Sequence, residues 1–253
     1  MRLNRAAATM AVALLIAGCS GSAAPAATSA ASSPAPSAAT SPAPASPAAA
    51  SSAPAASPSG AASPAAAASP DLSSCPTSQP APLASGQTRT VTLSTSKGDI
   101  VIRVEGALSP IAAGNFVALA QCGYYTGVVF HRLVPGFVIQ GGDGQYGREP
   151  AVNMASVGTG GPAYTIQDEP VTADYTRGTV AMAKTGQPNS ANSQFFIVLA
   201  DLTGSLPKNY QIFGHVTSGM DVVDAIAAMP NSGGPSNTAL QPVAMDKVTV
   251  SNP

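Results

Sequence analysis

The sequence predicts a closed antiparallel β-barrel or β-sandwich that follows a long N-terminal segment of different composition. Three observations support this prediction. The C-terminal part of the chain holds many short apolar runs, only two helical patterns occur among them, and strand and helix patterns do not alternate. An open sheet of so many short strands would leave unpaired edges, which closure removes.

The first elements of this part form a predicted β-hairpin. Residues 89–95 alternate polar and apolar side chains, and the Lys-Gly-Asp at 97–99 is typical of a turn. The strand pattern then resumes over residues 100–104. Two strands joined by so short a turn are expected to pair antiparallel.

A helix is predicted next. Ser109 followed by Pro110 is typical of a helix start, with serine as the N-cap and proline at the first helical position. Apolar residues including Phe116 and Leu119 continue the pattern until Gly123, near which the helix should end.

Short apolar runs after this helix are the remaining strand candidates. They occupy residues 128–131, 137–140, 178–183, 193–199 and 211–216. A second amphipathic helix is predicted over 220–229, with Val222, Val223 and Ile226 on one face. The Gly-Gly-Pro at 233–235 follows it, and residues 245–250 predict the last strand.

The N-terminus has the pattern of an export signal. Arg2 and Arg5 precede an apolar run over 11–16, which is too short to span a membrane. Residues 16–19 read Ile-Ala-Gly-Cys, which resembles the bacterial lipobox. The resemblance implies a signal peptide over 1–18, a diacylglyceryl group on Cys19, and a protein held by lipid at the extracytoplasmic face of a bacterial membrane. The alternative is an ordinary secretory signal that contains a cysteine.

Residues 19–85 are predicted to be a disordered linker. Every residue from 20 to 70 is Ala, Ser, Pro, Thr or Gly. Such a segment buries too little apolar area to offset the entropy of ordering its backbone. The 6 Tyr and 6 Phe of the chain all follow, which predicts a single folded domain over 86–253.

Charge and composition exclude several classes of function. The chain has 11 Lys+Arg against 12 Asp+Glu, so it lacks the basic field that binds nucleic acid. With 2 His and 3 Cys and no metal-binding motif, we expect no metal site. No G-x-S-x-G, phosphate-binding or dinucleotide-binding motif occurs, so we expect no cofactor.

One segment combines core-strand character with polar side chains. Residues 130–143 read Phe-His-Arg-Leu-Val-Pro-Gly-Phe-Val-Ile-Gln-Gly-Gly-Asp. Unpaired polar groups in a buried strand cost about 1–3 kcal/mol each. A bend at Pro135-Gly136 is needed to bring Arg132, Phe137 and Gln140 to one surface. Alternatively, the arginine pairs with an acid and the glutamine caps a loop.

This segment resembles the signature of the cyclophilin family of peptidyl-prolyl isomerases. Its Phe-His-Arg, the later Phe, and its Gln-Gly-Gly-Asp occupy the family's fixed positions. Further matches follow in the family's order. They are the glycine-rich 158–161, Val-Ala-Met-Ala at 180–183, Asn-Ser-Gln-Phe-Phe-Ile at 192–197, and Phe-Gly-His-Val at 213–216.

The resemblance implies an eight-stranded antiparallel barrel capped by two helices and an enzyme that accelerates rotation about Xaa-Pro bonds. It implies that Arg132 donates to the prolyl nitrogen in the twisted transition state, with Phe137 and Gln140 as the other catalytic residues. It also implies a substrate groove with these further residues: His131, Gly158, Ala183, Lys184, Gln194, Phe196, Leu206 and Tyr210. The implied partners are proline-containing polypeptides, and we expect a monomer.

Two departures and two open questions accompany the resemblance. Ser205 stands where many members carry Trp, and Tyr210 where His is frequent. Because the indole N–H of that Trp usually donates to cyclosporin, the drug should bind weakly, and tight inhibition at nanomolar drug would contradict this. Cys75 and Cys122 either form a disulfide or stay free. A lipoprotein that binds proline-containing segments without isomerising them remains the alternative function.

Overall fold

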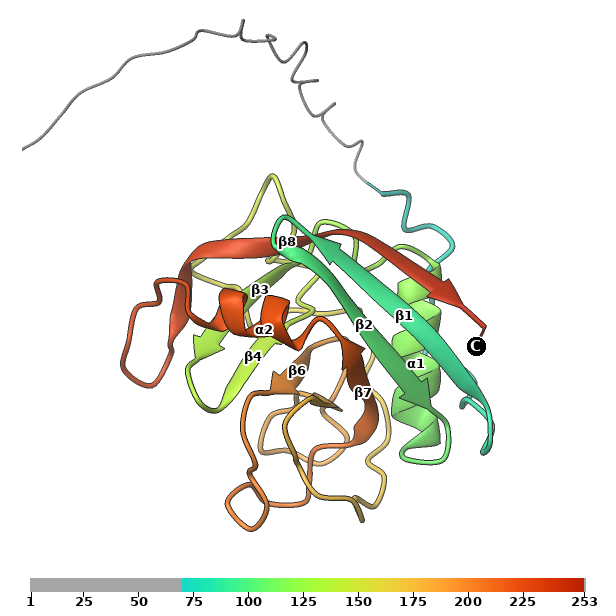
Figure 1. Cartoon of the computed structure of the whole chain (residues 1–253). Coiled ribbons are helices and arrows are strands. Elements are labelled where there is room, and N and C mark those ends of the chain that lie inside the picture. Colours follow the sequence, from blue (N-terminus) through green and yellow to red (C-terminus); the bar gives the residue numbers. More distant parts are fainter. Residues whose placement is uncertain (1–69, 253) are drawn as a thin grey trace, which may run out of the picture. The chain divides into compact units, whose positions relative to one another are not determined.

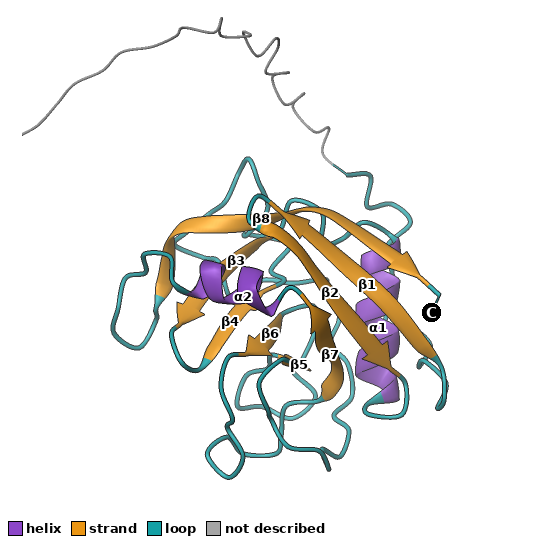
Figure 2. Cartoon of the chain, in the orientation of Figure 1, coloured by secondary structure: helices purple, strands orange, loops and turns teal. Residues whose placement is uncertain are grey.

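The computed structural model describes residues 70–252, and these residues form a closed barrel. The strand order around it is β1-β2-β7-β5-β6-β4-β3-β8, and every neighbouring pair is antiparallel. Two helices, α1 and α2, accompany the barrel (Figures 1 and 2). The predicted fold class is confirmed. The predicted signal peptide over 1–18, Cys19 and the part of the predicted linker up to residue 69 lie outside the described residues.

The predicted hairpin is present as β1 (Thr88–Thr95) and β2 (Gly98–Glu105). Thr95 pairs with Gly98, so the turn consists of residues 96 and 97. Apolar side chains alternate into the barrel along both strands, and Val91, Leu93, Ile100 and Ile102 are all fully buried.

Helix α1 (Pro110–Gln121) begins where predicted, but its cap differs from the prediction. The Ser109 side chain makes no capping hydrogen bond. Instead the Glu169 carboxylate accepts the N–H groups of Ile111 and Ala112, at 2.8 and 2.9 Å. A carboxylate satisfies these free donors and complements the positive end of the helix dipole better than a hydroxyl does.

The short apolar runs form the other barrel strands, each within a few residues of its predicted range. Their bounds are β3 (Val129–Val134), β4 (Val138–Gly141), β5 (Thr179–Met182), β6 (Phe195–Val198) and β7 (Ile212–Ser218). Helix α2 (Met220–Ala227) follows β7 and buries Val223, Ile226 and Ala227. Among the described residues, no helix has the length and apolar character to cross a membrane.

The last strand is longer than the sequence suggested. β8 spans Thr238–Ser251 rather than 245–250. Its first half pairs with β3 and its second half with β1, so this one strand closes the barrel. Pro242 obscured the first half, because proline cannot donate to a strand ladder. It is tolerated because the β3–β8 register shifts between Phe130 and Arg132, opposite this part of β8.

Residues 70–87, here called the strap, pack against α1 instead of belonging to the predicted linker (Figure 1). The N–H of Leu83 donates to the Pro110 carbonyl at 2.9 Å, and the Leu83 side chain is buried in the core. A Cβ atom on Gly114 would lie 2.2 Å from the Ala81 carbonyl oxygen, so only glycine allows this close approach. The folded part therefore begins upstream of residue 86.

A disulfide joins the strap to the end of α1. Cys75 and Cys122 are bonded, with Cα atoms 5.1 Å apart. The question that the sequence left open is thus answered in favour of pairing. The bond fixes the strap at the C-terminal end of α1, while Leu83 fixes it at the N-terminal end.

Candidate active site

A β-bulge at His131 places Arg132 on the outer face of the barrel. Phe130 pairs with Gly141 and Arg132 with Gln140, so His131 is skipped in the ladder between β3 and β4. Phe130 and Leu133 consequently both reach the core, while Arg132 between them does not. Bulges commonly redirect side chains beside active sites. The predicted bend at Pro135-Gly136 is present as the β3–β4 turn, but the bulge was not predicted.

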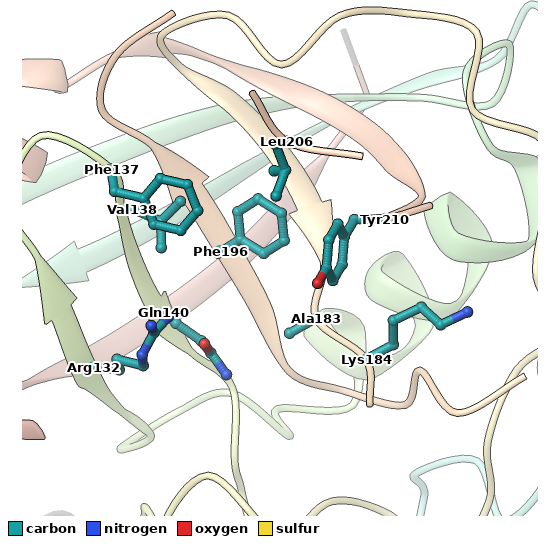
Figure 3. Close-up of a pocket in the computed structure, with 9 residues that line it drawn as sticks. All are labelled: Arg132, Phe137, Val138, Gln140, Ala183, Lys184, Phe196, Leu206 and Tyr210. Atoms are coloured by element: carbon teal, nitrogen blue, oxygen red, sulfur yellow. The ribbon is translucent and has the colours of Figure 1, made fainter. Parts of the chain in front are cut away.

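A pocket of about 210 Å³ lies on this outer face. The side chains that line it come from β3, β4, the end of β5, β6 and the loop before β7 (Figure 3). They are Arg132, Phe137, Val138, Gln140, Ala183, Lys184, Phe196, Leu206 and Tyr210. One end is apolar and the other carries the guanidinium of Arg132 and the amide of Gln140.

The apolar end is built on a second hydrophobic cluster, separate from the barrel core. Strand alternation produces it, because Phe195 of β6 points into the core while Phe196 points outward. The rings of Phe196 and Tyr210 meet edge to face, with centroids 5.5 Å apart. The hydroxyl of buried Tyr175 donates to the Tyr210 carbonyl and accepts its N–H, each at 2.9 Å, which fixes that wall.

Gln140 is oriented from behind by Gln194. The Gln140 amide donates to the side-chain oxygen of Gln194 at 3.0 Å. The Gln194 amide in turn donates to the carbonyls of Gly158 and Gly160, at 3.0 and 2.9 Å. Gln194 is only 7% exposed, and its two amide hydrogens and its side-chain oxygen hold the glycine-rich loop and Gln140.

Asp143 also holds the glycine-rich loop that contains Gly158 and Gly160. Its carboxylate, which is fully buried, accepts four backbone N–H groups, those of Gln145, Tyr146, Gly158 and Gly160, at 2.8–3.0 Å. A Cβ atom on Gly160 would lie 2.6 Å from the Asp143 carboxylate, so this position requires glycine.

Arg132 is the cation at the polar end of this pocket. None of the ion pairs between described residues involves it. The alternative in which Arg132 pairs with an acid is therefore wrong. The guanidinium is left available to a ligand that lies beside the apolar end.

The family model of the cyclophilin type peptidyl-prolyl cis-trans isomerases matches residues 90–250, more than half of the chain. The chain belongs to this family. This cyclophilin is accordingly a peptidyl-prolyl cis-trans isomerase that acts on proline-containing peptides. The strap lies outside the matched residues.

Related proteins match most of their own length. The peptidyl-prolyl cis-trans isomerase of Acinetobacter baylyi is 40% identical over 167 residues, which are 63% of this chain and 84% of the relative. The isomerase cyp18 of Streptomyces antibioticus is 38% identical over 170 residues, 64% of this chain and 98% of the relative. A Cryptosporidium parvum cyclophilin, solved in the presence of the dipeptide Ala-Pro, has a TM-score of 0.55 and 28% identity, and the match covers 65% of this chain and 99% of that one.

The cyclophilin pocket brings together most of the residues that the sequence indicated. His131, Gly158 and Gln194 are the exceptions, because they lie behind the lining rather than in it. Sequence reasoning missed Val138, which lines the pocket, and two residues that support it, Asp143 and Tyr175. Asp143 ends the signature segment over 130–143, but two of its four backbone partners, Gly158 and Gly160, lie 15 and 17 residues away in the sequence. Ser205 is not among the lining residues, whereas its neighbour Leu206 is.

His131 is buried beneath the glycine-rich loop of the cyclophilin site. It is 4% exposed, and a Cβ atom on Gly158 would lie 3.3 Å from its Nε2. Burial lowers the pKa of His131 to about 4, although the charge of Asp143 opposes the shift; the charge of Arg132 adds to it. His131 is thus neutral in the folded protein at physiological pH, and it supports the loop rather than walling the pocket.

We expect the stability of this cyclophilin to fall in mild acid because of His131. The folded state keeps the ring neutral down to about pH 4, whereas the unfolded chain binds a proton below about pH 6.5. His131 therefore leaves the free energy of unfolding unchanged above pH 6.5 and lowers it by up to about 3 kcal/mol as the pH falls to 4. Urea unfolding of wild type and His131→Gln at pH 7 and 4.5 measures this. An equal loss in both proteins would contradict it.

The described part of the cyclophilin, residues 70–252, contains no group of three His, Cys, Asp or Glu residues that could hold a metal ion. The pocket itself offers the guanidinium of Arg132, the amide of Gln140 and an apolar surface. These can bind and polarise a peptide bond.

Proposed function

We propose that this isomerase stabilises the twisted Xaa-Pro bond through Arg132. Rotation removes the amide resonance, which gives an uncatalysed barrier of about 18–20 kcal/mol. In the twisted state the prolyl nitrogen becomes pyramidal and regains its lone pair, so a donor aimed at it binds this state more strongly than the planar one. The unpaired guanidinium beside the apolar end of a pocket of about 210 Å³ is the observation that carries the proposal.

The remaining pocket residues have complementary proposed roles. Phe137, Phe196 and Leu206, with the ring of Tyr210, would hold the proline ring at the apolar end. One amide hydrogen of Gln140 is used by Gln194, which leaves the other and the carbonyl oxygen for the substrate backbone. The related cyclophilin solved in the presence of Ala-Pro supports an Xaa-Pro dipeptide as the unit that the pocket recognises.

We propose that the enzyme works as a monomer outside the cytosol, on exported polypeptides, and is anchored by lipid on Cys19. The lipobox-like residues 16–19 support the anchor. The disulfide between Cys75 and Cys122 supports an oxidising compartment, because cytosolic thiols are usually kept reduced. The uncharged segment over 20–69 would then separate the domain from the membrane.

The lipid anchor predicts that the full-length protein incorporates labelled fatty acid and partitions into detergent. Cys19→Ser should abolish both, because Cys19 carries the lipid. Cys122→Ser is the matched control, since it also replaces a cysteine but leaves Cys19 in place. Labelling of the Cys19→Ser protein would contradict the anchor without affecting the isomerase assignment.

A further inference from the structure

Lys184 is the second cation of the pocket lining, and Asp168 neutralises it. The Lys184 Nζ lies 2.5 Å from the Asp168 Oδ2. The Lys184 side chain is 9% exposed and that of Asp168 33%, so the pair is partly withdrawn from water. In Figure 3 the lysine leaves Ala183 on the side of the pocket away from Arg132, and its ammonium points away from the centre. This side of the pocket therefore carries no net charge.

Asp168 is held in this position by Asn189. The Asp168 Oδ2 accepts the Asn189 N–H at 3.0 Å, and the Asp168 N–H donates to the Asn189 Oδ1 at 2.7 Å. Burial alone would raise the pKa of Asp168, but the hydrogen bonds from Lys184 and Asn189 outweigh it and lower the pKa. The carboxylate is thus ionised at neutral pH. It contacts both ends of the loop that follows Ala183, at Lys184 and at Asn189.

The residues on either side of Asp168 are also fixed. The N–H of Gln167 donates to the side-chain oxygen of Gln79 in the strap, at 2.9 Å. Glu169 caps α1 and accepts a hydrogen bond from Gln211, the neighbour of Tyr210 in the pocket wall, at 2.9 Å. The strap and α1 therefore hold the segment that presents Asp168 to Lys184.

We propose that Asp168 determines the charge selectivity of the groove: by cancelling the charge of Lys184, it lets the enzyme accept prolines flanked by acidic or by basic side chains. The proposal rests on the proposed placement of the substrate in this pocket. Lys208, near Tyr210 in the sequence, is likewise paired, with Asp174 at 2.8 Å. Arg132 then remains the one uncompensated cation among the described lining residues. Without Asp168 there would be two, and acidic flanking residues would be favoured.

The test compares peptides that carry Glu or Lys one residue before or after an Ala-Pro unit. Exchange spectroscopy by NMR measures kcat/KM for each peptide without a coupling protease. Asp168→Asn should raise the Glu-to-Lys ratio of kcat/KM about threefold to tenfold on at least one side of the proline. The gain should shrink at high salt, because salt screens a partly exposed charge.

Lys184→Met provides a second, opposite arm. It leaves Asp168 unpaired beside the groove, so the Glu-to-Lys ratio should fall below that of wild type. The double variant Asp168→Asn/Lys184→Met should return the ratio close to wild type. Should Asp168→Asn fail to fold, the direction of the shift in Lys184→Met decides.

The matched control is Asp224→Asn. It removes the carboxylate from an equally short ion pair, Arg177 with Asp224 at 2.6 Å, and neither residue lines the pocket. Its ratio should equal that of wild type. If Asp168→Asn lowers kcat/KM equally for all peptides, or leaves the ratio unchanged, the proposal is overturned. Absence of catalysis by the wild-type protein on every peptide would instead overturn the proposed function.

Discussion

Arg132→Ala should lower kcat/KM for an Xaa-Pro peptide about 10²–10³-fold, the loss typical for a transition-state donor. The guanidinium has no ion-pair partner among the described residues, so its removal should lower the rate of isomerisation and not the stability of the fold. A chymotrypsin-coupled isomerisation assay measures the effect. Because the interaction forms in the twisted state, the loss should fall mainly on kcat.

Two further variants sharpen this result. Arg132→Lys keeps the charge but loses the planar fork, so it should fall between wild type and Arg132→Ala. Arg103→Ala is the matched control, because this exposed arginine of β2 does not line the pocket, and it should keep wild-type kcat/KM. Wild-type activity in Arg132→Ala would eliminate the proposed mechanism.

Asp143→Ala should reduce the free energy of unfolding by at least about 3 kcal/mol, because each buried N–H group that loses its acceptor costs about 1–3 kcal/mol. It leaves four backbone N–H groups without their acceptor, two of them in the glycine-rich loop. Urea unfolding gives the stability change, and amide exchange should show Gly158 and Gly160 losing protection. Activity should fall too, because Gln194 and hence Gln140 depend on this loop.

Asp201→Ala is the control for this substitution. Asp201 also accepts a backbone N–H, that of Thr203 at 2.9 Å, but it lies in an exposed turn. Its loss should change the free energy of unfolding far less than the loss of Asp143, because water can replace the carboxylate as the acceptor of an exposed N–H group. Equal stability changes in the two variants would show that Asp143 does not organise the loop.

Local patterns predicted the elements, and distant contacts account for the differences. The hairpin, both helices and the inner strands follow from apolar periodicity, which any short window of sequence displays. The first half of β8 does not, because Pro242 is acceptable only opposite the bulge in β3. Glu169 replaces Ser109 as the helix cap for a similar reason, since nothing near Ser109 in the sequence announces it.

The sequence predicted the residues that line the pocket better than the residues that lie behind the lining. Arg132, Phe137 and Gln140 follow from the signature and meet in one pocket. Gln194 is a glutamine like Gln140 and was also expected in the substrate groove, yet its amide donates to the carbonyls of Gly158 and Gly160. Such a difference depends on the bulge and the loop path, which spacing alone does not encode.

The closing role of β8 has a consequence for biosynthesis. A polypeptide emerges N-terminal end first, so β1 exists long before β8, its barrel neighbour, has been made. Cys75 and Cys122 both emerge well ahead of β8. In an oxidising compartment the strap can therefore be linked to α1 before β8 pairs with β1, and the pairing of β8 then closes the barrel.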